Sequence, residues 1–383
     1  MFDLFLKNAQ VYDGAFRPAN LLIQSGKITA VGTDVRNTAA VPELDAHGCR
    51  AVPGFIDVHT HGAVGVDVNA ADPAGLAKIG RFFASQGTTR WLASILTDTP
   101  EQTLAASGAV KQAMTFTGGA RLLGIHLEGP FLSPDYKGAM PPALLQKGNV
   151  PLLEKYRAAA GEALRYITMA PEVEGVPACI DALRGSGVRV ALGHSGATYA
   201  QTQDCLARGA VAFTHTANGM RLFHQHEPAI FGAALESDGW CEAICDGRHL
   251  HPGTVCMLLK CKGENRVLAI TDSIMAAGLP DGRYRLGVND VVVKDGDAML
   301  ADGSSRAGST LTMQKALQNL LAFTGRPMEK LLPLMAQNQA EMLGLQGRYG
   351  ALRRGCAGDV VLLDEKANVL VTVAGGEIVW EKN

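Results

Sequence analysis

The chain has 383 residues, of which 47% are hydrophobic and 19% charged, with a formal net charge of −2. This composition can bury a large core, and the near-neutral charge argues against a broad surface for nucleic acid or anionic membranes. No start region joins positive charge to an apolar stretch, and no run of eighteen apolar residues occurs. We therefore expect a cytoplasmic protein with no nucleic-acid or membrane partner, although a local basic pocket is compatible with this charge.

Both ends of the chain are rich in predicted strands. The first fifty residues contain short runs that are apolar or alternate, with a turn at Asp13-Gly14. The last thirty have the same character, and Gly375-Gly376 forms a predicted hairpin turn. One small sheet domain assembled from both termini would explain this symmetry. The predicted domains are a β-sandwich from residues 1–50 and 350–383 and an α/β domain from residues 51–349.

The middle of the chain alternates between strands and helices. Eight short apolar runs cover residues 51–58, 89–96, 121–127, 165–170, 188–192, 211–214, 241–244 and 266–271. Helical patterns lie between them, for example over residues 74–86, 101–114, 151–160, 199–208 and 252–260. Eight such units suit a closed parallel barrel, but a doubly wound open sheet would also alternate in this way.

The positions of polar residues decide between these two folds. Each suggestive side chain lies at or shortly after the carboxyl end of a predicted strand: His59, His61, Glu128, His194, His215, His249 and Asp272. In a barrel these ends converge on one face, whereas an open sheet would spread them along a line. The sequence therefore predicts a (β/α)₈ TIM barrel that carries the β-sandwich domain.

These residues have the chemistry of a metal site. His59 and His61 are two apart, and the period of a strand directs both imidazoles to the same side. Glu128 with His194 and His215 supplies one carboxylate and two histidines, a ligand set of hydrolytic zinc sites that leaves open positions. Any one of them alone could be a hydrogen-bonded core or loop residue. Their joint occurrence at strand ends favours a metal centre.

Asp272 closes the eighth predicted strand and is the candidate catalytic residue. A carboxylate beside a metal site can accept a proton from the attacking water and return it to the leaving group. Asp272 could instead cap a helix or act as a further ligand. Two weaker signals are Asn218-Gly219 and residues 306–308, whose glycine-containing loops could present backbone N–H groups to an anion.

Seven segments, in the correct order along nearly the whole chain, resemble the N-acetylglucosamine-6-phosphate deacetylase family of the amidohydrolase superfamily. An eighth, at 355–364, resembles the closing β-sandwich piece that amidohydrolases share. The segments are GFIDVHTHG at 54–62, HLEGPFLSP at 126–134, GHSGAT at 193–198, THTANGM at 214–220, DGRH at 246–249, TDSIMAAG at 271–278, AGSTLTM at 307–313 and GCAGDVVLLD at 355–364.

The resemblance implies a metal-dependent deacetylase that hydrolyses N-acetyl-D-glucosamine 6-phosphate to D-glucosamine 6-phosphate and acetate. Glu128, His194 and His215 match the main metal ligands of the family. His59 and His61 match a second metal position that some members keep and others have lost. The implied cofactor is one or two divalent ions per subunit, with Zn²⁺ favoured over Fe²⁺, Mn²⁺ or Co²⁺, and the family is typically homodimeric.

The resemblance also assigns a catalytic residue and substrate contacts. Asp272 matches the proton-transferring aspartate. The positions that match substrate-contacting residues are Ala139, Met140, Asn218, Gly219, His226, His249, Arg306, Ala307 and Gly308.

Two positions depart from the family pattern. Met140 stands where members often carry a polar residue, and a thioether cannot donate a hydrogen bond to a sugar hydroxyl. His226 precedes Glu227-Pro228 where the family usually has an arginine that grips phosphate, and histidine offers no bidentate fork. Arg221 or His224 could compensate for that loss.

Three other interpretations stay open. The substrate could be the galacto epimer or another N-acyl amino sugar. A different amidohydrolase, such as a cyclic-imide hydrolase or an acyl-amino-acid deacylase, often bridges two metals with a modified lysine after the fourth strand, but residues 166–172 contain no lysine. A non-catalytic member would be expected to lose ligands, whereas this chain keeps every candidate.

Overall fold

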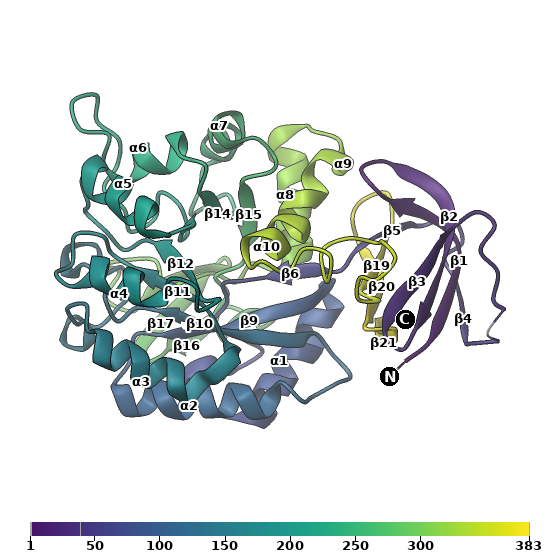
Figure 1. Ribbon diagram of the computed structural model, residues 1–383, viewed down its shortest axis with the longest axis horizontal. Helices are drawn as coiled ribbons and strands as arrows, with labels where there is room; N and C mark the ends of the chain where they lie inside the picture. Colours follow the sequence, from purple (N-terminus) through teal and green to yellow (C-terminus); the bar gives the residue numbers. More distant parts are fainter. Residues whose placement is uncertain (1, 39, 383) are drawn as a thin grey trace.

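A parallel barrel lies at the centre of the molecule (Figure 1). In the computed structural model, which describes residues 2–38 and 40–382, its eight strands follow one another in chain order around the sheet. They are β6 (Phe55–Asp57), β9 (Thr88–Leu96), β10 (Arg121–Glu128), β11 (Leu164–Met169), β12 (Arg189–Leu192), β13 (Ala212–Phe213), β14 (Trp240–Ile244) and β15 (Val267–Ile270). Each overlaps one predicted apolar run, although residues 51–53 of the first run belong to the terminal sheet, and the predicted (β/α)₈ barrel is confirmed.

The barrel closes just beyond the ends of its first and last strands. The amide N–H of Asp272 donates to the carbonyl oxygen of His59 at 2.9 Å, and Thr60 bridges Ser273 in parallel. The Thr271 hydroxyl donates to the Asp57 carboxylate at 2.5 Å. Closure therefore brings together the two segments that carry candidate site residues.

Helices surround the barrel and begin at capped positions. The Asp72 carboxylate accepts from the Ala74 amide at 3.0 Å, and Pro73 occupies the first position of α1, a combination that favours a helix start. None of the described helices is long and apolar enough to cross a membrane. The α-helices are α1 (Pro73–Ser85), α2 (Pro100–Ala113), α3 (Val150–Ala160), α4 (Val176–Leu183), α5 (Tyr199–Arg208), α6 (Ala229–Glu236), α7 (Pro252–Lys262), α8 (Met313–Thr324), α9 (Met328–Leu331) and α10 (Gln337–Met342), with 3₁₀ turns at Val68–Ala70, Pro134–Tyr136, Pro142–Leu144, Gly161–Ala163 and Leu332–Met335.

The two ends of the chain form a separate sheet, as predicted, seen as purple and yellow strands in Figure 1. Strand β5 joins the two ends, because it pairs parallel to β1 and antiparallel to β19. A buried ion pair connects this sheet to the barrel, with Arg90 Nε 2.7 Å and Arg90 Nη2 2.8 Å from the Asp359 carboxylate. The strands are β1 (Leu4–Tyr12), β2 (Phe16–Gln24), β3 (Lys27–Gly32), β4 (Glu43–Asp45), β5 (Arg50–Pro53), β19 (Val360–Leu363), β20 (Val369–Ala374) and β21 (Glu377–Glu381).

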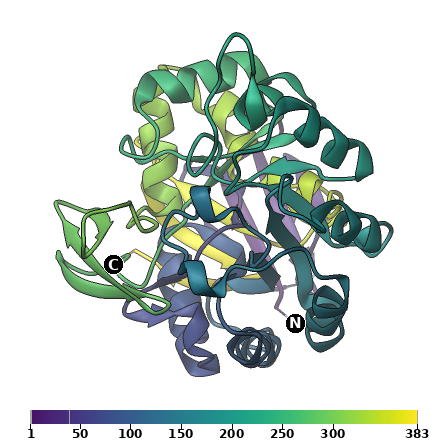
Figure 2. The ribbon, with the colours of Figure 1, turned by 90° about the vertical axis from the view of Figure 1, so that its left-hand side faces the viewer.

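A three-stranded antiparallel sheet after β15 was not predicted from the sequence. It comprises β16 (Gly282–Leu286), β17 (Asn289–Lys294) and β18 (Asp297–Leu300), and it lies to the side of the barrel in Figure 2. Its apolar face packs on barrel residues that include Leu96 and Met140. The Gly287 amide donates to Asp67 at 2.7 Å, and the Asn289 side chain donates to the Ala139 carbonyl at 2.8 Å. These contacts hold the sheet beside the carboxyl ends of the strands. A two-stranded ribbon, β7 (Gly62–Ala63) with β8 (Val66–Asp67), completes the inventory.

Candidate metal centre and active site

The six candidate metal and catalytic residues meet at the carboxyl end of the barrel. Glu128 is the last residue of β10. The others lie in the loops that begin directly after β6, β12, β13 and β15. All six side chains are buried, with at most 10% of any one exposed. The structure therefore brings together the six residues that the sequence placed at strand ends.

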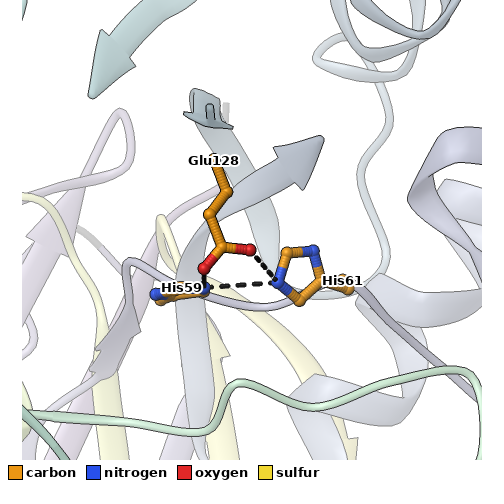
Figure 3. A group of neighbouring side chains, drawn as sticks. All are labelled: His59, His61 and Glu128. Carbon is orange, nitrogen blue, oxygen red and sulfur yellow. Dashed lines mark hydrogen bonds and ion pairs between the residues drawn. The ribbon is translucent and has the colours of Figure 1, made fainter. Parts of the chain in front are cut away.

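Four imidazole nitrogens surround the Glu128 carboxylate. The Nε2 atoms of His59 and His61 lie 3.4 and 3.1 Å from its two oxygens, as Figure 3 shows. The Nε2 atoms of His194 and His215 lie 3.1 and 3.2 Å from Oε1. Two three-residue groups with the spacing of a metal site therefore share Glu128.

The Nδ1 atom of each of these four histidines, on the side away from Glu128, already has a hydrogen-bond partner. The Nδ1 atoms of His61, His194 and His215 lie 2.9–3.1 Å from backbone carbonyl oxygens, which can only accept. Nδ1 of His59 lies 3.0 Å from the Glu242 carboxylate. Each Nδ1 must therefore carry the proton, which leaves the Nε2 lone pair of a neutral ring facing the centre.

This arrangement suits a bound cation. The Nε2 atoms of His59 and His61 are 3.2 Å apart, and those of His194 and His215 are 3.0 Å apart, too close for unshared lone pairs. An anion ringed by four imidazole lone pairs fits a divalent metal ion.

Backbone strain is concentrated at the same residues. His194, His215 and Asp272 have φ angles of 50°, 27° and 49°, in the left-handed region that side chains with a Cβ rarely adopt. Each such residue costs about 1–3 kcal/mol and persists only where its surroundings hold it. The loops after β12, β13 and β15 therefore adopt strained backbone conformations that lower stability and that direct these three side chains into the centre.

His126 belongs to the same motif as Glu128 but does not join the centre. Its Nδ1 lies 2.9 Å from the Ser94 hydroxyl, and its Nε2 lies 2.9 Å from the Thr168 hydroxyl. Burial, and next the nearby His59, lower its pKa well below the usual value. A neutral ring whose nitrogens are both engaged is a packing partner for His59, whose ring centroid lies 4.6 Å away.

Glu242, in the middle of β14, was not identified from the sequence. Its fully buried carboxylate accepts from His59 Nδ1 at 3.0 Å, from the His215 amide at 3.0 Å and from the Tyr166 hydroxyl at 2.7 Å. Burial, and then this carboxylate, raise the pKa of Tyr166 well above its usual range, so the phenol stays a donor. Glu242 is a positioning residue that fixes the His59 tautomer. A lone charged residue inside the apolar run 241–244 was the available signal.

We expect Glu242→Gln to weaken metal binding by about 10- to 100-fold, the range found when partners of metal-ligating histidines are changed. An amide has one acceptor oxygen, so it cannot accept from both sides as the carboxylate does. The measurement is metal affinity by competition with a chelator dye, with the unfolding temperature as a check on folding. Glu236→Gln is the matched control, because Glu236 also accepts from a tyrosine hydroxyl, Tyr199 at 3.0 Å, but lies exposed. Equal affinities for the Glu242→Gln variant and the wild type would contradict the role.

A cavity opens onto the metal centre, and most of the predicted substrate contacts line it. Asp272 and Glu128 lie on its wall, and Asp272 Oδ1 is 3.3 Å from His61 Nε2. Gly219 needs its positive φ of 56°, and a Cβ there would come within 3.2 Å of His194 Nδ1. The predicted substrate contacts that line the cavity are Ala139, Met140, Asn218, Gly219, His249, Arg306 and Gly308.

Two predicted substrate contacts lie elsewhere. Ala307 is fully buried, and its amide donates to the Ala298 carbonyl at 3.1 Å, so that N–H is not available to a ligand. His226 is exposed on the loop between β13 and α6 and does not line the cavity of its own chain. Its backbone amide donates to Nδ1 of His224 at 3.3 Å. The substrate contacts expected of these two residues stay predictions, and neither residue lines the cavity of its own chain.

The barrel and the metal centre define a metal-dependent hydrolase of the amidohydrolase class, and the comparison with known families agrees. The model of the amidohydrolase family matches residues 50–379. An N-acetylgalactosamine-6-phosphate deacetylase of Escherichia coli O157:H7 is 38% identical over 86% of this chain and 87% of its own length. An N-acetylglucosamine-6-phosphate deacetylase of Lysinibacillus sphaericus is 33% identical over 100% of this chain and 99% of its own.

Solved structures point the same way. A crystal structure of N-acetylglucosamine-6-phosphate deacetylase from Thermotoga maritima has a TM-score of 0.89 at 32% identity, covering 99% of this chain and 100% of that one. The Mycobacterium smegmatis enzyme in complex with N-acetyl-D-glucosamine 6-phosphate gives 0.91 at 32% identity, with the same coverage. The chain belongs to the N-acetylglucosamine-6-phosphate deacetylase family of the amidohydrolases.

Proposed function

We propose that this protein hydrolyses N-acetyl-D-glucosamine 6-phosphate to D-glucosamine 6-phosphate and acetate. The observation that carries the proposal is the shared cavity, whose wall contains the Glu128 centre and the Asp272 carboxylate together. Relatives that carry this activity in their names match the chain over nearly its full length. The cavity also contains polar groups that suit a sugar, among them Asn218 and His249.

The metal, when bound, supplies a Lewis acid that polarises the acetamide carbonyl and lowers the pKa of water. Asp272 accepts the proton of the attacking water and passes it to the departing amine, because its carboxylate lies on the cavity wall beside the centre but belongs to neither candidate ligand group. His249 presents its ring to the cavity in a fixed orientation, since its Nδ1 lies 2.6 Å from the Asp246 carboxylate. We propose Zn²⁺ as the metal: Glu128, His194 and His215 would hold one ion, and His59 and His61 would hold a second together with Glu128.

The galacto epimer is the second candidate substrate. The relative from Escherichia coli O157:H7, at 38% identity, is named for N-acetylgalactosamine 6-phosphate. The two sugars differ in the orientation of one hydroxyl, so the same centre and the same Asp272 would serve both. The choice between the two epimers therefore rests on the other residues that line the cavity.

We also propose that the protein works in the cytoplasm as a homodimer. All eight cysteines are free, which suits a reducing compartment. Leu222 and Phe223 are 61% and 56% exposed on the loop that carries His226, and exposed apolar side chains of this size favour a protein partner. A second copy of the chain would bury them.

Acetate release by metal-replete protein tests the function. The comparison is kcat/KM for N-acetylglucosamine 6-phosphate, for its galacto epimer and for unphosphorylated N-acetylglucosamine. We expect both 6-phosphates to exceed the unphosphorylated sugar, with the gluco epimer the best of the three. A better galacto epimer would select the second candidate. No acetate from any of the three would reject the proposed deacetylation.

A further inference from the structure

A phosphorylated substrate needs a cation in the cavity, and the metal centre lies at the acetamide end. Among the described residues that line the cavity, Arg306 is the single lysine or arginine. Arg306 directly follows Ser305, another cavity residue, and it bridges Met299 of β18 in the three-stranded sheet. The unpredicted sheet thus positions a permanent positive charge in the wall of the site.

Arg306 is held in a fixed orientation by Asp297. Its Nε and Nη2 atoms each lie 3.0 Å from one oxygen of the Asp297 carboxylate, a bidentate pair. Such a pair takes one edge of the guanidinium and leaves Nη1 free to donate elsewhere. With its side chain 41% exposed, Arg306 keeps its charge at little desolvation cost.

A second arginine shares the same carboxylate. Arg248 Nη1 lies 3.9 Å from Asp297, and its Nη2 donates to the Asp295 carbonyl. The guanidinium groups of Arg306 and Arg248 therefore both lie within ion-pair distance of the Asp297 carboxylate. The nearby Asp246 is turned to the His249 ring and to the backbone amides of Arg248 and His249. Asp246 is thus engaged by its own neighbours, and Asp297 is the carboxylate that contacts both guanidinium groups.

We propose that Arg306, oriented by Asp297 and supported by Arg248, binds the phosphate group of the substrate. This inference rests on the proposed function and names the residues that select a phosphorylated sugar at that site. It explains how the chain recognises phosphate although histidine replaces arginine at position 226, outside the cavity of its own chain. A phosphate oxygen receives the free Nη1–H of Arg306, and the second guanidinium adds charge behind it.

Lys137 is the rival cation. Its ammonium donates to the Gly138 carbonyl at 3.3 Å, and Gly138 lines the cavity, although Lys137 does not. A lysine in this place is a point charge on a flexible stem, whereas Arg306 is preset by two hydrogen bonds. The inference therefore favours Arg306, and Lys137→Met belongs in the test.

The test compares kcat/KM for N-acetylglucosamine 6-phosphate and for unphosphorylated N-acetylglucosamine in each variant. Arg306→Met is expected to lose about 10- to 100-fold on the phosphorylated sugar, mainly through KM, a size typical of hydrogen bonds to charged groups. The unphosphorylated sugar should change by less than about threefold. Arg248→Met should lose less than Arg306→Met does. Inhibition by inorganic phosphate should weaken by a similar factor in Arg306→Met.

Arg285→Met is the matched control. Arg285 lies on β16 of the same small sheet and also pairs with an aspartate, Asp290 at 3.4 Å, but it does not line the cavity. It should leave both sugars unchanged. Equal losses on both sugars in Arg306→Met, no loss at all, or a phosphate-specific loss confined to Lys137→Met would each overturn the assignment while leaving the deacetylase function intact.

Failure of the function itself looks different. If the wild type releases no acetate from either sugar, deacetylation is rejected, and direct binding of inorganic phosphate by calorimetry then decides the anion site. Binding to the wild type that is lost in Arg306→Met supports the site. No binding to the wild type overturns it.

Discussion

Replacing Asp272 by asparagine is expected to lower kcat for acetate release by about 10²–10⁴-fold, the contribution typical of a general acid–base residue. Asparagine keeps the size of the side chain and can still lie 3.3 Å from His61 Nε2, but it cannot accept a proton. The four histidines and Glu128 remain, so the variant should hold as much metal as the wild type.

The measurement combines stopped-time acetate assays with metal analysis of the same sample. Asp290→Asn is a suitable control, because Asp290 is an exposed carboxylate of the three-stranded sheet that lies outside the cavity. Full metal content with activity within a few-fold of the wild type would remove Asp272 from the proton-transfer role. Loss of metal would instead make Asp272 a ligand.

Replacing Glu128 by alanine should abolish both metal binding and activity. Glu128 is common to the two candidate ligand groups, so its loss leaves two separate histidine pairs with no carboxylate between them. Removing a direct ligand should exceed the 10- to 100-fold effects known for outer-shell partners. Metal stoichiometry after dialysis is the direct readout.

Comparing Glu128→Ala with Glu242→Gln separates the effect of a direct metal ligand from that of a residue that positions the ligands. Glu128→Ala should lose more metal affinity than Glu242→Gln, because Glu242 acts only through His59, His215 and Tyr166. Glu128→Ala protein that keeps wild-type metal content, with activity within tenfold, would contradict the assigned ligand set.

The strand ends account for what the sequence predicted well. Buried parallel strands read as uninterrupted apolar runs, and a polar residue directly after such a run, like Glu128 after residues 121–127, stands out. All strand ends of a barrel lie on one face. The predicted strands alone were therefore enough to expect His194 near His59, although the two residues are far apart in the sequence. The helices and the terminal sheet were also predicted from local patterns of apolar residues and turns.

The elements that were missed depend on contacts between distant segments. Glu242 stands out as a charge inside an apolar run, but its role depends on partners on β11 and on the loops after β6 and β13, and the local sequence does not identify those partners. His226 was assigned by its place in a motif, but the orientation of the loop keeps it out of the cavity. The sheet β16–β18 did carry a signal, since Asp295-Gly296 has positive φ angles of 52° and 74°, as in a two-residue hairpin turn.

Acetate release from N-acetylglucosamine 6-phosphate, measured on one preparation with its metal, after its removal and after its return, tests metal-dependent deacetylation. We expect release with metal present, a loss of nearly all activity when the metal is removed, and recovery when Zn²⁺ is restored. Unchanged acetate release from protein shown to be free of metal would contradict it, because the Glu128 centre would then have no part in the reaction.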